Sequence, residues 1–89
     1  MKSIAVQIEG IVQGVWFRQS TCNKALELGV SGVVCNKPDG TVYVEITGED
    51  VAVRSLVEFC RQGPPGAEVK KVVITDIIPR HEGEFYILR

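Results

Sequence analysis

The chain has 89 residues and a formal net charge of −1, because 10 Lys and Arg stand against 11 Asp and Glu. This length suits a single domain over residues 1–89 and is too short for two. The near-neutral charge argues against a nucleic-acid binder, which usually carries a basic excess, and against binding to an anionic membrane surface. The sequence shows no signal peptide and no apolar run long enough to span a membrane.

The first part of the chain predicts a strand, a loop and a helix. Residues 3–10 alternate apolar and polar side chains, which is typical of a half-buried strand with Ile4, Val6 and Ile8 on one side. Residues 10–17 contain two glycines and predict a loop. Residues 17–28 change to a helical spacing, and one predicted helix face carries Cys22, Ala25, Leu26 and Gly29. Gly29 also favours the end of this helix.

The second part of the chain predicts a hairpin, a second helix and two more strands. Residues 31–37 and 41–47 read as strands joined by a tight turn at Pro38-Asp39-Gly40. Asp50 is a candidate N-cap for a helix whose apolar stripe would consist of Val53, Leu56, Val57 and Cys60. The break at residues 62–66 ends this helix, a long strand is expected over 69–79, and a short edge strand over 85–88.

The order β-α-β-β-α-β is the ferredoxin-like pattern of the α+β class. We expect an antiparallel sheet with strand order 4-1-3-2, both helices on one face, and the short fifth strand at the edge. This fold carries RNA binders, metal carriers, regulatory modules and enzymes, so function has to be argued from a site.

The most informative segment is Gly10-Ile-Val-Gln-Gly-Val-Trp-Phe-Arg18, between the first strand and the first helix. A glycine-containing loop at a helix N-terminus can turn several backbone amides toward one anion such as phosphate. Arg18 would add a bidentate fork that suits phosphate oxygens. The segment is neither a Walker A loop nor GxGxxG. From these residues alone, an ordinary turn with a solvated or carboxylate-paired Arg18 is an equal alternative.

Asn36 is the second candidate, at the end of a strand just before the turn. Asn is a common turn residue, so a purely structural role is the simpler interpretation of this position alone. Its carboxamide can nevertheless both donate and accept hydrogen bonds, which would allow it to hold a water molecule.

Together these two segments resemble the acylphosphatase family. The family signature G-x-V-Q-G-V-x-F-R is matched by residues 10–18, and a strand ending in Asn before a D-G-T-V turn is matched by residues 32–42. The resemblance implies hydrolysis of acyl phosphates to carboxylate and phosphate, with no cofactor, metal or phosphoenzyme. It implies that Arg18 binds the phosphoryl group and that Asn36 orients the attacking water. It also implies that phosphate is bound by the backbone amides of Gln13, Gly14, Val15, Trp16, Phe17 and Arg18.

Some positions depart from the family pattern or leave alternatives open. Val33 replaces a frequent Trp, and Lys37 replaces a frequent Thr or Ser that can support the Asn or the water. Trp16 could line the pocket or cover the edge of the core, and we expect the second. His81, in a polar turn, is expected to be a solvated loop residue.

Two other classes of function remain as alternatives. A non-catalytic phosphate-binding module would use the same loop, but would have no need of Asn36. A ferredoxin-like RNA binder would show paired exposed aromatic residues on its sheet, and the central strands offer Tyr43 alone. The three cysteines show no zinc or CxxC spacing, so we expect free thiols in a monomeric cytoplasmic protein: Cys22, Cys35 and Cys60.

Overall fold

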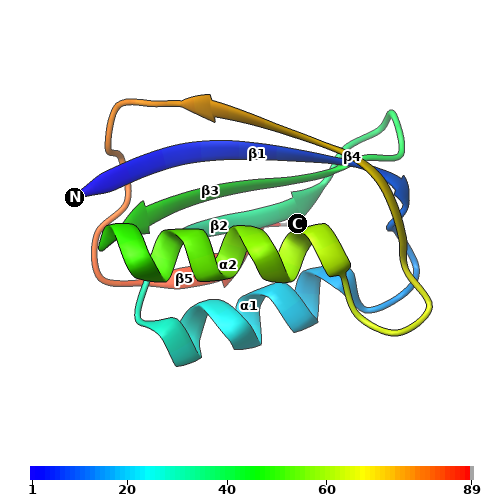
Figure 1. The fold of residues 1–89 in the computed structure, drawn as a ribbon, viewed down its shortest axis with the longest axis horizontal. Helices are drawn as coiled ribbons and strands as arrows, with labels where there is room; N and C mark the ends of the chain where they lie inside the picture. The colour runs from blue at the N-terminus through cyan, green and yellow to red at the C-terminus, as the bar shows by residue number, and fades with distance from the viewer. Residues whose placement is uncertain (89) are drawn as a thin grey trace.

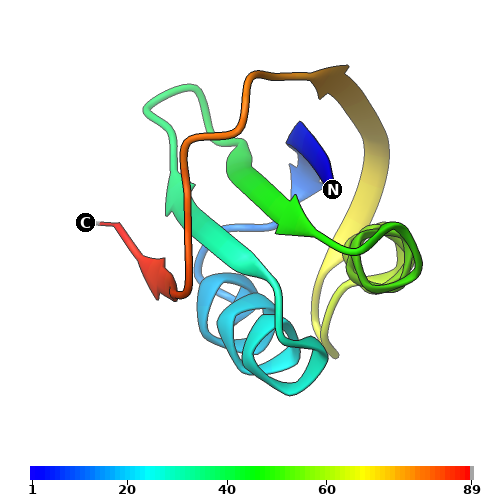
Figure 2. The same ribbon diagram turned by 90° about the vertical axis from the view of Figure 1, so that its left-hand side faces the viewer.

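The computed structural model describes residues 1–88. Its elements follow the predicted order with a fifth strand added: β1 (Lys2–Ile11), α1 (Phe17–Leu28), β2 (Ser31–Asn36), β3 (Val42–Gly48), α2 (Asp50–Gln62), β4 (Glu68–Asp76) and β5 (Phe85–Ile87). The two helices lie side by side under one face of the sheet (Figures 1 and 2). The predicted ferredoxin-like α+β fold is therefore confirmed.

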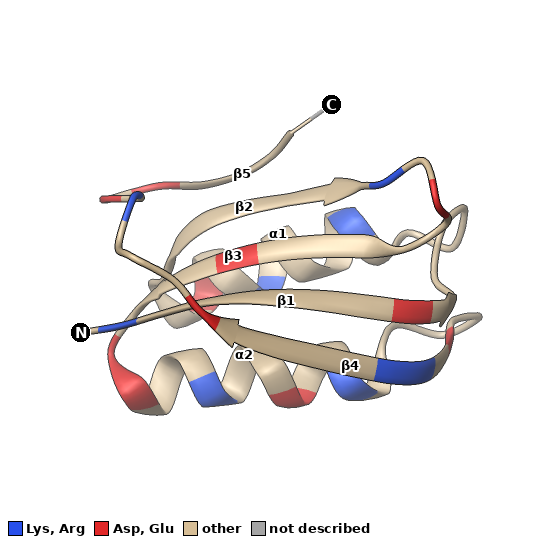
Figure 3. Cartoon of the chain, turned by 90° about the horizontal axis from the view of Figure 1, so that it is seen from above, with Lys and Arg blue, Asp and Glu red and all other residues tan. Residues whose placement is uncertain are grey.

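The sheet has the order β4-β1-β3-β2-β5, which contains the predicted order 4-1-3-2 and places the fifth strand at the edge. The four strands of the predicted order pair antiparallel as expected, and β5 adds a parallel pairing with β2, with Gly32 opposite Phe85. The chain crosses from β4 at one edge of the sheet to β5 at the other edge, as Figure 3 shows. There β5 runs in the same direction as β2. β2, which ends at Asn36, is thereby an interior strand.

The core fills the space between the sheet and the helices. The predicted stripe of α2 is confirmed, since Val53, Leu56, Val57 and Cys60 are all buried. The helix-facing sides of the strands are buried too: Ile4, Val6, Ile8, Val34, Val42, Val44 and Ile46. Burial in this layer raises the pKa of the Cys60 thiol to about 12. All three cysteines are free.

The stripe of α1 differs from the prediction. Cys22 and Ala25 are buried as expected, but Leu26 is 61% exposed. Phe17 and Thr21 complete the buried face instead. The spacing of four residues from Phe17 through Thr21 to Ala25 sets the direction of this face, and Leu26 lies beside it. Gly29 ends the helix as predicted, in the left-handed conformation with φ 74°.

The start of α2 also differs from the prediction in detail. Glu49 occupies the N-cap position without a side-chain cap, and Asp50 is the first helical residue. The Asp50 carboxylate lies 2.6 Å from the Arg54 guanidinium, one turn along the helix. An acidic residue in the first turn still favours the helix through its dipole.

The face of the sheet opposite the helices holds a buried carboxylate, that of Glu45. Its oxygens accept a hydrogen bond from the Tyr43 hydroxyl at 2.8 Å, lie 2.6 Å from His81 Nε2, and contact the Arg80 guanidinium. Burial raises the pKa of Glu45, but the hydrogen bonds from His81 and Tyr43 and the charge of Arg80 outweigh it and lower the pKa overall. The prediction of a solvated His81 is wrong, because this carboxylate holds the ring against the sheet.

Candidate active site

The loop that joins β1 to α1 begins at a bulge in β1. The pairing of β1 with β4 shifts register between Glu9 and Gly10. Gly10 has φ 137°, and a Cβ at this position would lie 2.0 Å from the carbonyl oxygen of Glu68. Only glycine permits this close approach of two backbones, so Gly10 fixes the point where the chain leaves the sheet.

The loop ends at an uncapped helix start. Trp16 is the N-cap residue of α1, with φ 64° and no side-chain capping bond, and the first turn of α1 contains no acidic residue. α2, by contrast, has Asp50 in its first turn. No carboxylate of this first turn therefore neutralises the partial positive charge of the α1 N-terminus, and such a helix start favours anions.

The backbone amides of the loop have no acceptor in the part of the chain that the structure describes. Within residues 1–88, the N–H groups from Gln13 to Arg18 have no backbone or side-chain acceptor. Backbone amides in folded proteins are nearly always paired with protein groups or water. This run of free donors next to the helix start is suited to a tetrahedral anion.

The loop is fastened to the β2–β3 hairpin by one side chain. Gln13 Nε2 donates hydrogen bonds to the carbonyl oxygens of Lys37 at 2.8 Å and Thr41 at 2.9 Å. The turn itself is held by Asp39, whose carboxylate accepts bonds from the Thr41 hydroxyl at 2.7 Å and the Thr41 amide at 3.0 Å. These bonds lower the pKa of Asp39. The family signature implies a role for the backbone amide of Gln13 alone; the signal for the side-chain role is that Gln13 is the one polar residue in a loop of glycine and apolar residues.

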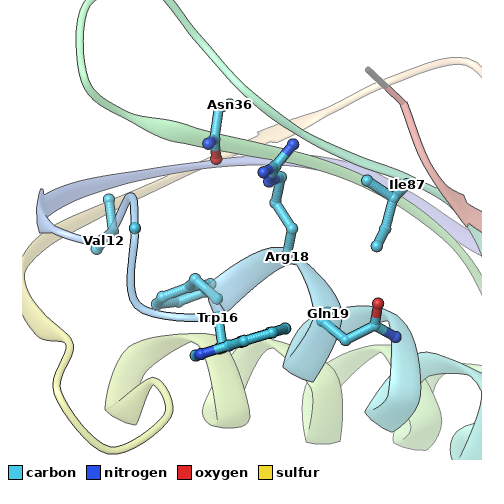
Figure 4. A pocket seen from close by; sticks show the side chains of 8 residues that line it. Val12, Trp16, Arg18, Gln19, Asn36 and Ile87 are labelled. Atoms are coloured by element: carbon cyan, nitrogen blue, oxygen red, sulfur yellow. The ribbon is translucent and has the colours of Figure 1, made fainter.

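One pocket brings the main predicted residues together (Figure 4). Its volume is about 350 Å³, and it is lined by Val12, Gly14, Trp16, Phe17, Arg18, Gln19, Asn36 and Ile87. Figure 4 shows Arg18 extending from the start of α1 and Asn36 projecting from the end of β2 toward the same space. Gln13 and Val15 are not part of the lining, because Gln13 faces the hairpin and Val15 packs against the core.

Two polar side chains of the pocket, Arg18 and Asn36, have unused hydrogen-bonding capacity. Asn36 Oδ1 is buried and has no hydrogen-bond partner within residues 1–88. No carboxylate of the same residues lies within 4.0 Å of the Arg18 guanidinium. A buried acceptor without a partner costs stability, so its presence in a pocket indicates a function there. The other such atom is the hydroxyl of Thr21, which faces the thiol of Cys60 and does not line the pocket.

Two residues that depart from the family pattern lie outside the pocket. The Lys37 ammonium lies 4.7 Å from the centre of the Tyr43 ring. This cation–π contact keeps its charge on the face of the sheet away from the helices. Val33 is buried opposite Glu45. Neither departure alters the pocket lining.

Trp16 differs from the expectation that it covers the edge of the core. Its side chain is 79% exposed and lines the pocket.

Residues 1–88 contain no group of three or more His, Cys, Asp and Glu side chains arranged to hold a metal ion. Over the same residues, neither helix has the length and hydropathy needed to cross a membrane.

Comparison with known proteins gives the family. The model of the family described as acylphosphatase matches residues 4–87. An acylphosphatase of Thiobacillus denitrificans is 47% identical over 85 residues, which cover 96% of this chain and 91% of that protein. The crystal structure of acylphosphatase from Bacillus subtilis superimposes with a TM-score of 0.93 at 29% identity, and all of both chains is covered. An acylphosphatase structure from Coxiella burnetii also gives 0.93, at 36% identity, over 98% of this chain and 92% of that one.

The fold and the pocket at the uncapped start of α1 suit a small α+β enzyme that acts on a phosphate-bearing substrate. The chain belongs to the acylphosphatase family. The resemblance inferred from residues 10–18 and 32–42, and the enzyme class that it implied, are therefore confirmed.

Proposed function

We propose that the enzyme hydrolyses acyl phosphates in the pocket between α1 and β2. Arg18 and the loop amides from Gln13 to Arg18 bind the phosphoryl oxygens, and Asn36 orients the attacking water. The observation that carries this proposal is the unpartnered Asn36 Oδ1, which shares a pocket with Arg18 at the uncapped end of a helix.

These groups suit the reaction chemically. The water oxygen forms a new bond to phosphorus while the bond from phosphorus to the acyl oxygen breaks, and the electron pair leaves with the carboxylate. A carboxylate is a weak base, so no strong general acid is required. Phosphoryl transfer proceeds mainly by positioning and charge stabilisation, and a single fixed donor contributes about 10²- to 10³-fold in rate.

Asn36 supplies the water position in this scheme. Its free carbonyl oxygen accepts one hydrogen bond from the water and leaves an oxygen lone pair directed at phosphorus. The protons of the water pass to the phosphate product and the solvent. A module that only bound phosphate would have no use for this acceptor, so the non-catalytic alternative is not favoured.

We further propose that residues 1–89 form one domain that carries this activity by itself, as a monomer in the cytoplasm. The near-neutral charge and the free thiols of Cys22, Cys35 and Cys60 support this setting. We expect no nucleic-acid or membrane partner, and a small acyl phosphate as substrate, with inorganic phosphate as product and competing ligand.

The test is an assay of the purified chain with benzoyl phosphate, with phosphate release as the readout. We expect turnover that inorganic phosphate inhibits competitively and that EDTA leaves unchanged. Binding of phosphate without turnover would favour the non-catalytic module, and a rate abolished by EDTA would contradict the proposed chemistry.

A further inference from the structure

The pocket has two chemically different parts. Arg18, Asn36 and the loop amides form a polar part, whereas Val12, Trp16, Phe17 and Ile87 contribute apolar surface. The volume of about 350 Å³ lies within the range of roughly 300–1,000 Å³ typical of small-molecule sites, so there is room beyond a phosphoryl group.

Trp16 is placed unusually for a large aromatic residue. It is the only tryptophan of the chain, and its side chain is 79% exposed. It does not belong to the hydrophobic core, although Val15 and Phe17 on either side pack there. Core packing therefore does not explain the indole at this position.

The backbone of Trp16 is also strained. With φ 64° and ψ 19°, it is the only non-glycine residue among residues 1–88 with a positive φ. Bulky residues rarely adopt this left-handed conformation, and such strain is concentrated at functional sites. Figure 4 shows the indole below the start of α1, beside Gln19, whereas the Arg18 side chain extends from the same helix start toward Asn36; both residues line the pocket.

We propose that the Trp16 indole is the binding surface for the acyl group, and that the enzyme prefers acyl phosphates with a flat aromatic acyl group. This inference rests on the proposed function and names its substrate class. With the phosphoryl group held by Arg18 and the loop, the acyl group extends toward the apolar side of the pocket. There an aromatic ring stacks on the indole, while a methyl group covers little of it.

The test compares benzoyl phosphate with acetyl phosphate through the ratio of their kcat/KM values. This ratio cancels any effect of a substitution on the shared phosphoryl chemistry. In Trp16→Ala we expect the ratio to fall about 3- to 10-fold, the size of one aromatic stacking contact. Trp16→Phe should keep most of the ratio. Leu26→Ala is the matched control, because Leu26 is an exposed apolar residue near the other end of α1 and does not line the pocket.

A second measurement uses the wild-type chain. Since Trp16 is the only tryptophan, its fluorescence reports on this site alone. Benzoylphosphonate, which cannot be hydrolysed, should change the emission much more than acetylphosphonate or inorganic phosphate. Equal responses to the three compounds, or an unchanged ratio in Trp16→Ala, would overturn the inference. If either result occurred while the wild type hydrolysed both substrates, the proposed function would still hold and only the role of Trp16 would be refuted. Failure of the wild type to hydrolyse either substrate would refute the proposed function instead.

Discussion

Gln13 Nε2 lies 2.8 Å from the carbonyl oxygen of Lys37, the residue directly after Asn36. Its second bond reaches the carbonyl oxygen of Thr41, across the hairpin turn. One side chain of the loop between β1 and α1 thus fixes the position of the strand end that carries Asn36. The two halves of the site, which are far apart in the sequence, are aligned through this link.

Loss of this link should reduce catalysis without unfolding the protein. In Gln13→Ala we expect kcat/KM for benzoyl phosphate to fall about 10- to 100-fold, because small displacements of aligned groups slow reactions strongly. The free energy of unfolding should fall by about 1–2 kcal/mol, as two partly exposed hydrogen bonds are lost. Urea unfolding and steady-state kinetics measure both. Gln62→Ala, at the exposed end of α2, is the control; equal kinetics in the two variants would exclude a positioning role.

Arg18 should be required for phosphate binding. Arg18→Ala is expected to lower kcat/KM by about 10³-fold or more and to weaken inhibition by inorganic phosphate, since the charged fork toward the phosphoryl oxygens is removed. Arg18→Lys keeps the charge but loses the bidentate geometry, and should be intermediate. Arg54→Ala on α2 serves as the control. Normal turnover by a folded Arg18→Ala protein would refute the assigned role.

Asn36 should contribute to turnover more than to phosphate binding. Its buried, unpartnered acceptor should lower the stability of the folded protein. In Asn36→Ala we expect kcat to fall about 10²- to 10³-fold while the inhibition constant of phosphate changes little. The same variant should be as stable as the wild type or more stable by about 1 kcal/mol, because it removes a buried acceptor that has no protein partner. Parallel losses of turnover and phosphate affinity, together with a destabilised fold, would point to a structural role.

Glu45 should make stability depend on pH in the acid range. Its pKa in the folded state is below the ordinary value of 4.5, so the unfolded chain binds the proton more tightly. The stabilisation is therefore fully present above that value and is lost as the pH falls through the lowered folded pKa. Glu45→Gln should lose about 1–3 kcal/mol near neutral pH, and its difference from the wild type should shrink as the pH falls through the lowered pKa of Glu45.

Urea unfolding at several pH values measures this difference. Glu68→Gln, which changes an exposed carboxylate at the edge strand, provides the comparison and should stay close to the wild type. A constant gap between wild type and Glu45→Gln from neutral to acid pH would show that the charge of Glu45 is not the stabilising feature.

The sequence predicted the sheet order and the stripe of α2, because strand alternation and regular helical spacing are local signals. It predicted the pairing of Arg18 with Asn36 only through the family signature, since neither residue is distinctive alone. The exposed Leu26 could not be foreseen, because the direction of the α1 face depends on what packs against it.

Two other features depend on contacts between distant segments. The contact of His81 with Glu45 joins residues that lie 36 positions apart, and no local pattern announces it. Trp16 is exposed at a position where the backbone is left-handed, and the composition of the loop predicts neither feature. The types of the helices and strands could thus be predicted from the sequence, whereas long-range contacts and local backbone strain could be seen only in the structure.

The position of β5 has a consequence for how the enzyme comes into being. Ile87 lines the pocket, and its strand pairs with the strand that ends at Asn36, while Arg18 comes from the beginning of the chain. The pocket can therefore be completed only after the chain has been synthesised as far as β5. Contacts of such long sequence separation fold slowly. Recovery of hydrolytic activity during refolding would accordingly report the last stage of assembly, and a nascent chain that stalls before this strand would remain inert.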